Sequence, residues 1–144
     1  MDNLLKFAAA ITSAMFAGAA FYVSAVEQPA RLEAEAVAAI LQFKSSYKRA
    51  APIQVVFSAV CFLACLALWL RTHMWEWLAA GVLVVAVIPY TLAFMLPVNR
   101  ALLAAASPPD AAATLLLNRW GQLHAVRTIL GLVGFVWILL QTVR

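Results

Sequence analysis

Charged side chains are scarce in this chain, at 11% of its 144 residues, while hydrophobic residues make up 66%. A soluble domain carries about 25% charged residues on average, so the composition excludes an ordinary soluble protein. Only two histidines and two cysteines are present, which leaves few nitrogen and sulfur donors for a dedicated transition-metal site. The net charge is +4, and the basic residues are spread over the segments between apolar runs. They form no basic patch interleaved with aromatic residues, and this excludes a nucleic-acid partner.

What the chain has in place of charge is four long apolar runs. They lie near residues 4–26, 52–70, 78–96 and 123–140. Each has about 20 residues, the length that a helix needs to cross a ~30 Å hydrocarbon core. The runs lack the alternation of barrel strands, and open strands cannot span lipid. The sequence therefore predicts an all-α fold, an integral membrane four-helix bundle forming a single domain over residues 1–144.

The first apolar run resembles a secretion signal only in its small-residue ending, Val23-Ser24-Ala25. The run is longer than a typical signal core, and only Lys6 stands before it as a basic residue. We therefore expect this run to be the first membrane helix rather than a cleaved segment.

The basic residues predict an orientation in the lipid bilayer. Four crossings place both termini on one membrane side and the two long connections on the other. The terminal side has Lys6, Arg71 and Arg144. By the positive-inside bias, we expect the termini outside and the long connections in the cytoplasm. The basic residues on the long-connection side are more numerous: Arg31, Lys44, Lys48, Arg49, Arg100, Arg119 and Arg127.

The connection between the first two runs has a pattern of its own. Apolar residues recur there at helical spacing, opposite glutamates and lysines. This pattern predicts an amphipathic helix that lies on the membrane surface and runs into the second helix. It fits equally a connector packed over the bundle and a lid over the entrance for a lipophilic molecule. The apolar positions are Leu32, Ala36, Ile40, Phe43 and Tyr47.

Trp120, His124 and Arg127 form the strongest candidate site, at the start of the last apolar run. At about 100° per residue they fall on one helix face. An imidazole and a guanidinium in this position carry a large desolvation cost, and polar groups within membranes are usually functional. The alternative is structural, since buried polar groups also hold helices together and a long cation can extend to the interface.

The predicted topology brings further polar residues to the same depth. Helices one and three end where helices two and four begin, so Glu27, Tyr47 and Asn99 lie level with the cluster. Gly131 and Gly134 continue the face of Arg127 and allow either tight helix packing or a cavity for a flat ligand. In the third run, Pro89 predicts a kink that widens the bundle. We therefore expect a pocket at this membrane face.

Cys61 and Cys65 stand four residues apart within the second run. Side chains at this helical spacing meet disulfide geometry poorly. We interpret both cysteines as small apolar filler, with soft-metal ligation or redox chemistry as the alternative.

The arrangement Trp120-xxx-His124-xx-Arg127, following Pro97-x-Asn99, resembles the anthrone oxygenase-like family of small four-helix membrane proteins. The resemblance covers nearly the whole chain, although its motifs are short. It implies oxygenation of polyketide anthrones to anthraquinones without an obvious cofactor, and many members of the family have no assigned reaction. Other residues that fit the resemblance are Gly18, Pro29, Phe43, Tyr47 and Pro52.

The resemblance implies a base, an oxyanion stabiliser and a dry aromatic pocket. His124 would be the catalytic base, because an imidazole titrates near neutrality. Arg127 and Asn99 would hold the enolate oxygen.

The same resemblance implies substrate-binding residues around this catalytic group. Trp120 and Tyr22 would stack on the ring system of the substrate. Tyr47 would line the pocket, and Glu27 would orient the histidine or the arginine.

Two other classes of function remain open from the sequence. A metal- or haem-dependent redox protein would use His124 as a ligand, assisted by Glu27 or a cysteine. A non-enzymatic protein would bind or transport a small molecule or serve as a subunit of a complex. Because four helices make a thin-walled transporter, a transport role predicts a homo-oligomer.

Overall fold

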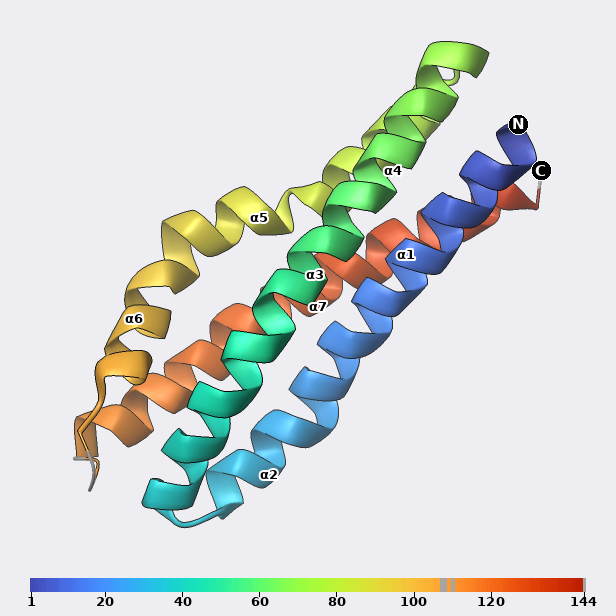
Figure 1. Ribbon diagram of the computed structural model, residues 1–144. Coiled ribbons are helices and arrows are strands. Elements are labelled where there is room, and N and C mark those ends of the chain that lie inside the picture. Colours follow the sequence, from blue (N-terminus) through green and yellow to red (C-terminus); the bar gives the residue numbers. More distant parts are fainter. Residues whose placement is uncertain (107–108, 110, 144) are drawn as a thin grey trace.

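Four long helical spans make up the fold in the computed structural model, which describes residues 1–106, 109 and 111–143 (Figure 1). No strand occurs among these residues, which confirms the predicted all-α class. Each span is long and apolar enough to cross a membrane, as in a multi-pass integral membrane protein.

The first and third spans are divided into shorter segments. Two of these segments are π-helical and are labelled η. The bounds are, for the first span, α1 (Asp2–Tyr22), η1 (Val23–Glu27) and α2 (Gln28–Glu33); for the second, α3 (Ala36–Thr72); for the third, α4 (Trp75–Val85), α5 (Val87–Tyr90), η2 (Thr91–Met95) and α6 (Leu96–Ala104); and for the fourth, α7 (Ala111–Thr142).

The spans are longer than the apolar runs that predict them, at 30 to 37 residues. From Ala36 to Tyr47 the amphipathic segment forms the first part of α3, whereas its first position, Leu32, belongs to α2. One continuous helix, α3, therefore stands where the sequence suggested a surface helix running into a second one. Likewise, α7 begins at Ala111, twelve residues before the predicted start at 123. His124 therefore lies about 20 Å along α7 at 1.5 Å per residue, well inside the helix rather than at its mouth.

Both chain ends lie at the same end of the bundle (Figure 1). The first span packs against α3 and α7, and α4 packs against the same two helices. The turn from α3 to α4 is short because His73 adopts a left-handed conformation, with φ at 56°, and its N–H donates to the Trp69 carbonyl oxygen. The even number of crossings agrees with the prediction from the apolar runs.

We call the end of the bundle with the two termini the terminal half. Its core is apolar and closely packed, with fully buried side chains that include Phe16, Cys61, Cys65, Val84 and Ile138. An added Cβ at Gly134 would meet Val84 Cγ2, and one at Gly131 would lie 2.7 Å from Phe16 Cε1. Of the two alternatives that the sequence left open for these glycines, the structure shows tight helix packing.

The third span departs from a straight helix between Val85 and Leu96. Pro89 has no N–H to donate to the Val85 carbonyl, and α4 ends at that residue. The π-helical segment η2 follows, in which the Leu96 N–H donates to the Thr91 carbonyl five residues earlier. Figure 1 shows α5 bowed away from α3 at this point. The kink predicted from Pro89 is therefore present.

Candidate functional site

The other end of the bundle, which we call the site half, buries polar side chains from all four spans. They converge on the middle of α7 from α2, from α3 and from α6. Because buried polar groups are costly in a helical membrane protein, this half holds the candidate functional site. The buried polar residues of this half are Gln28, Arg31, Gln54, Asn99, His124, Arg127 and Thr128.

Trp120 lies at the centre of this half and fixes three neighbours. Its indole Nε1 donates a hydrogen bond of 2.8 Å to Asn99 Oδ1. Its ring stacks on the His124 ring at 4.8 Å and meets the Phe43 ring edge-on at 5.2 Å. The α7 face predicted from helical spacing is thus buried as a unit, with Trp120, His124 and Arg127 at 5%, 2% and 8% exposure.

Asn99 connects Trp120 to Tyr47. Its Oδ1 accepts from the indole, and its Nδ2 donates to the Tyr47 hydroxyl oxygen at 3.2 Å. Because Tyr47 accepts in this bond, its own hydroxyl proton stays available for another acceptor. Asn99 therefore holds two neighbouring side chains in place.

Two hydroxyl groups connect His124 to the first span. The Thr128 hydroxyl lies 3.0 Å from the Ala20 carbonyl oxygen and 3.3 Å from that of His124, and both of these atoms can only accept. Ser24 Oγ lies 2.7 Å from the Thr128 hydroxyl and 3.1 Å from His124 Nδ1. If Thr128 donates to a carbonyl oxygen and Ser24 donates to Thr128, Ser24 accepts from His124 Nδ1. This arrangement favours the neutral tautomer with its proton on Nδ1 and a free electron pair on Nε2.

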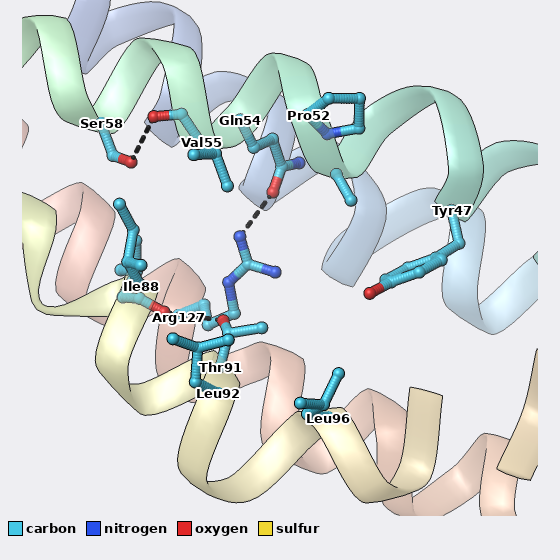
Figure 2. Close-up of a pocket in the computed structure, with 12 residues that line it drawn as sticks. Tyr47, Pro52, Gln54, Val55, Ser58, Ile88, Thr91, Leu92, Leu96 and Arg127 are labelled. Atoms are coloured by element: carbon cyan, nitrogen blue, oxygen red, sulfur yellow. Dashed lines mark hydrogen bonds between the residues drawn. The ribbon is translucent and has the colours of Figure 1, made fainter. Parts of the chain in front are cut away.

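Arg127 is a buried cation that lacks a counter-charge among the described residues. Its NH2 nitrogen donates to Gln54 Oε1 at 2.8 Å, and its Nε is buried without a partner in this part of the chain. Figure 2 shows the guanidinium between α3 and the third span, with Gln54 opposite and the Tyr47 hydroxyl turned toward the same space.

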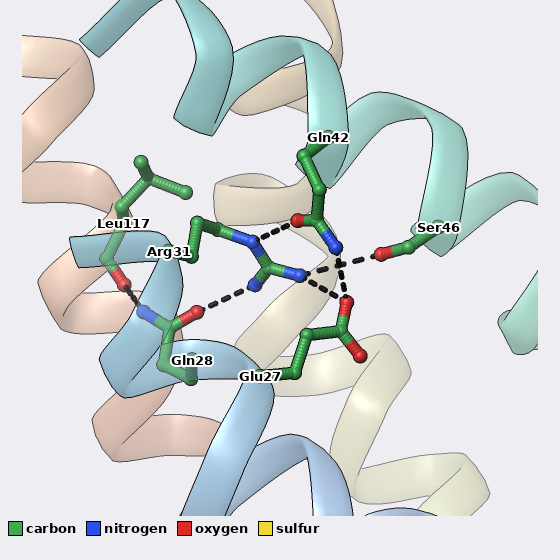
Figure 3. A network of polar contacts seen from close by, with 6 residues as sticks. All are labelled: Glu27, Gln28, Arg31, Gln42, Ser46 and Leu117. Carbon is green, nitrogen blue, oxygen red and sulfur yellow. Dashed lines mark hydrogen bonds and ion pairs between the residues drawn. The ribbon is translucent and has the colours of Figure 1, made fainter. Parts of the chain in front are cut away.

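Arg31 forms a second polar centre, shown in Figure 3. Its guanidinium donates to Glu27, Gln28 and Gln42 at 2.5 Å each. Gln28 in turn donates to the Leu117 carbonyl oxygen of α7 at 2.8 Å. This network joins α2, α3 and α7.

The same guanidinium lies 5.5 Å from the Phe43 ring and 5.4 Å from the Trp120 ring, within reach of a cation–π contact with each. Glu27 forms an ion pair with Arg31, at 2.5 Å, and accepts from Gln42. The structure shows no hydrogen bond between Glu27 and either His124 or Arg127, so the predicted orienting role of Glu27 stays a prediction.

Two cavities meet at Arg127. The smaller one, about 30 Å³, lies beside His124 and Trp120. The larger one, about 220 Å³, lies between α3 and the kinked third span (Figure 2). Both are lined by Tyr47, Gln54 and Arg127. A small pocket lined by several polar side chains thus adjoins a larger, mostly apolar one.

Tyr22 lies apart from both cavities. It is 57% exposed and lines a groove on the outer surface, together with Val26 and the Glu27–Arg31 pair. The structure therefore does not bring Tyr22 to the ring of His124. Of the remaining sequence-predicted site residues, those that line the smaller cavity are Glu27, Tyr47, Trp120, His124 and Arg127.

Three residues of the site escaped the sequence analysis. In the sequence, Arg31 counted only as one of the basic residues that predict the orientation in the membrane. Its position four residues after Glu27 is, however, the spacing of a helical ion pair. Thr128 stands one turn after His124, a spacing that predicts contact on one helix face. Ser24 reaches His124 from a π-helical turn, and no local signal in the sequence indicates that turn.

No group of three or more histidine, cysteine, aspartate or glutamate side chains gathers into a metal-binding arrangement within residues 1–106, 109 and 111–143. Cys61 and Cys65 are free thiols in the core of the terminal half, so they lie in a different cluster from Trp120.

The fold and the site define a class: a small helical membrane protein with a buried polar centre beside an apolar cavity. The sequence profile of the family described as anthrone oxygenase matches residues 40–137, and the chain belongs to this family. The matched region contains Tyr47, Asn99, Trp120, His124 and Arg127, whereas the first span lies outside it.

Two curated relatives share this description. The anthrone oxygenase tpcL of Aspergillus fumigatus is 41% identical over 69 residues, which cover 45% of this chain and 43% of the relative. An anthrone oxygenase of Claviceps purpurea is 44% identical over 68 residues, which cover 41% of this chain and 39% of the relative. The matches therefore span less than half the length of either relative. No solved structure matches the chain.

Proposed function

We propose that the protein is a membrane-embedded, cofactor-independent oxygenase that acts on a lipophilic, anthrone-like substrate. One observation carries this proposal: His124 and Arg127 line the same small pocket, and Arg127 has no counter-charge among the described residues. A neutral base beside a fixed cation is what proton abstraction next to a carbonyl requires, because the cation stabilises the enolate as it forms. Membership in the anthrone oxygenase family supports the choice of substrate.

The proposed reaction balances without a further reductant. His124 Nε2 accepts the acidic C–H proton of the anthrone, which leaves a delocalised carbanion. The carbanion gives an electron pair to dioxygen, a C–O bond forms, and the peroxide takes up a proton. Loss of water then breaks the O–O bond and creates the second carbonyl. One oxygen atom ends in the quinone and the other in water.

The surrounding residues have separate roles in this proposal. Arg127 and the free hydroxyl proton of Tyr47 face the enolate oxygen, while Trp120 stacks on the His124 ring and holds it in place. Asn99 acts as a positioning residue, because both of its polar atoms are occupied by Trp120 and Tyr47. The smaller cavity has about the volume of one water molecule, which suits dioxygen.

We further propose that the site half faces the cytoplasm and the termini lie outside, as the excess of basic residues on the long connections predicts. A cysteine-labelling experiment on intact cells tests this. Single cysteines placed at Lys48 and at Glu76 would react with a membrane-impermeant reagent only at Glu76.

Oxygen uptake by the purified protein with an anthrone in detergent or liposomes tests the reaction. His124→Asn is expected to lower the rate about 10²- to 10⁴-fold, the range for loss of a general base. The matched control is His73→Asn, which changes the chain's other histidine in the turn at the opposite end of the bundle. Equal rates for the two variants would contradict the proposed role of His124.

Two outcomes separate the alternatives. A stoichiometric metal or haem that is needed for turnover would replace the cofactor-independent mechanism. Binding of the anthrone without oxygen uptake, unchanged in His124→Asn, would indicate a binding protein instead.

A further inference from the structure

Among the described residues, Arg127 is the one buried guanidinium of the site half with an unpartnered nitrogen atom. Two ion pairs occur among the described residues: Arg31 with Glu27 in the site half, and Arg71 with Asp2 in the terminal half. Arg127 has only the neutral Gln54 as a hydrogen-bond partner, and its Nε has none among the described residues. The guanidinium also lies 5.9 Å from the centroid of the Phe16 ring, a cation–π contact that supplies no negative charge. A buried cation without a counter-charge in a membrane span is costly. The arrangement therefore points to an anionic group that is supplied from outside the chain.

The larger cavity offers the space for that group. Its wall is largely apolar, and Figure 2 shows Arg127 and Gln54 bonded in the middle of the lining residues, with Tyr47 at one side and its hydroxyl turned toward the guanidinium. The hydroxyls of Ser58 and Thr91 also line the cavity, but each donates to a backbone carbonyl of its own span and offers no free proton. The cavity is thus a largely apolar slot in which Arg127, Gln54 and Tyr47 supply the free hydrogen-bond donors.

The slot opens sideways rather than toward either end of the bundle. Val55 of α3 and Leu92 of η2 line it and are also 46% and 60% exposed on the outer surface. Both residues lie within membrane-crossing spans, so this surface faces lipid. The bend of the third span at Pro89 separates the two walls. A molecule dissolved in the hydrocarbon can therefore reach Arg127 without passing through water.

We propose that this lateral cavity is the substrate-binding site and that it selects flat, membrane-partitioned ring compounds with an acidic phenol or enol oxygen at one edge. The inference rests on the proposed function, and it adds where the substrate lies, how it arrives and which edge is recognised. The ionised oxygen would accept hydrogen bonds from Arg127 and Tyr47, with the rings against Val55, Ile88 and Leu92. A volume of about 220 Å³ is slightly below that of common ligand pockets, and the open mouth lets part of the ligand stay in lipid.

A hydroxylated anthraquinone is a suitable probe, because it is stable and its visible absorption changes when the phenol ionises. Its binding to the detergent-purified protein is measured for Val55→Trp, in which the indole fills the slot. The matched control is Val56→Trp, because Val56 is also exposed to lipid at 56% but does not line the cavity. We expect at least about tenfold weaker binding for Val55→Trp and less than about twofold change for Val56→Trp.

The charge requirement has its own measurement. The bound phenol should ionise at lower pH than the free probe, and this shift should disappear in Arg127→Gln. The methyl ether of the probe has no acidic oxygen and should bind at least about tenfold more weakly. If the ether binds as well as the phenol, or if a fatty-acid anion displaces the probe at equal concentration, the proposed ligand class is wrong.

Failure of the binding site and failure of the proposed function can be told apart. Equal binding by Val55→Trp and Val56→Trp overturns the lateral site even if the wild-type protein consumes oxygen. Conversely, a protein that binds the probe in this cavity and consumes no oxygen contradicts the oxygenase and supports the site.

Discussion

The two halves of the bundle solve the problem of packing in lipid in opposite ways. The terminal half brings helices together through small residues, such as Gly81 against Cys65 and Gly134 against Val84. The site half holds its helices apart with long polar side chains and keeps two cavities open between them. The close-packed half therefore serves as a fixed base, and the polar half has room for a ligand.

The helices themselves change character at the boundary between the halves. Both π-helical segments, η1 and η2, belong to the site half, and each is followed within two residues by a proline, Pro29 or Pro97. A proline leaves the carbonyl four residues earlier without its usual donor, and a wider turn accommodates this. Two residues beyond each proline stands a side chain that contacts Trp120, namely Arg31 and Asn99. The irregular turns thus place the side chains of Arg31 and Asn99 against Trp120.

The largest difference in stability between the two halves is expected when one ion pair is removed from each. Arg31→Met takes away a buried cation and leaves Glu27, Gln28 and Gln42 without their shared donor. We expect a loss of about 3 kcal/mol in the free energy of unfolding, as for a buried pair that loses one partner. Thermal unfolding in detergent, followed by circular dichroism, measures this.

Arg71→Met is the matched control, since the Arg71–Asp2 pair has side chains that are 43% and 44% exposed. An exposed pair contributes little to stability, because water screens both charges. Equal destabilisation by the two substitutions would show that the Arg31 network is no more important to the fold than a surface contact.

A smaller effect is expected from adding one methyl group to the terminal half. In Gly134→Ala the new Cβ meets Val84, so that side chain or the helix must shift, at a cost of about 1–3 kcal/mol. Gly18→Ala on α1 is the control, because nothing lies within 4 Å of the added Cβ. The same unfolding measurement should place Gly18→Ala at or slightly above the wild-type stability. A destabilised Gly18→Ala together with an unchanged Gly134→Ala would refute the packing interpretation.

The sequence predicts the spans well and the buried face of the first span poorly, for one physical reason. Hydrophobicity identifies a membrane helix because lipid excludes polar side chains along its whole length. In lipid, however, the buried and the lipid-facing sides are both apolar, so little amphipathic contrast remains. The buried positions of α1 include Ser13, Phe16 and Ala20, whereas Tyr22 faces outward.

Residues at polar positions were easier to place. Trp120, His124 and Arg127 are close in sequence on one helix, so a helical spacing of about 100° per residue was enough to predict their shared face. Asn99 and Tyr47 followed from topology alone. Arg31 could not be placed, because its burial depends on α2 packing against α3 and α7 through Gln42 and Gln28, which are contacts between distant segments.

The smallest expected effect is also the sharpest test of the site half, because it concerns a single proton. Ser24→Ala removes the acceptor for His124 Nδ1–H, whereas the control Ser13→Ala removes a buried serine of α1 that bonds only to a backbone carbonyl. With the acceptor lost, the proton is free to move to Nε2, and we expect oxygen uptake to fall about tenfold, the kinetic equivalent of about 1.4 kcal/mol. Nitrogen NMR identifies the protonated ring atom directly in a His73→Asn background, which leaves His124 as the sole histidine. A proton on Nε2 in the unsubstituted site would rule out the hydroxyl chain from Ala20 through Thr128 and Ser24, and with it the assignment of His124 as a ready base.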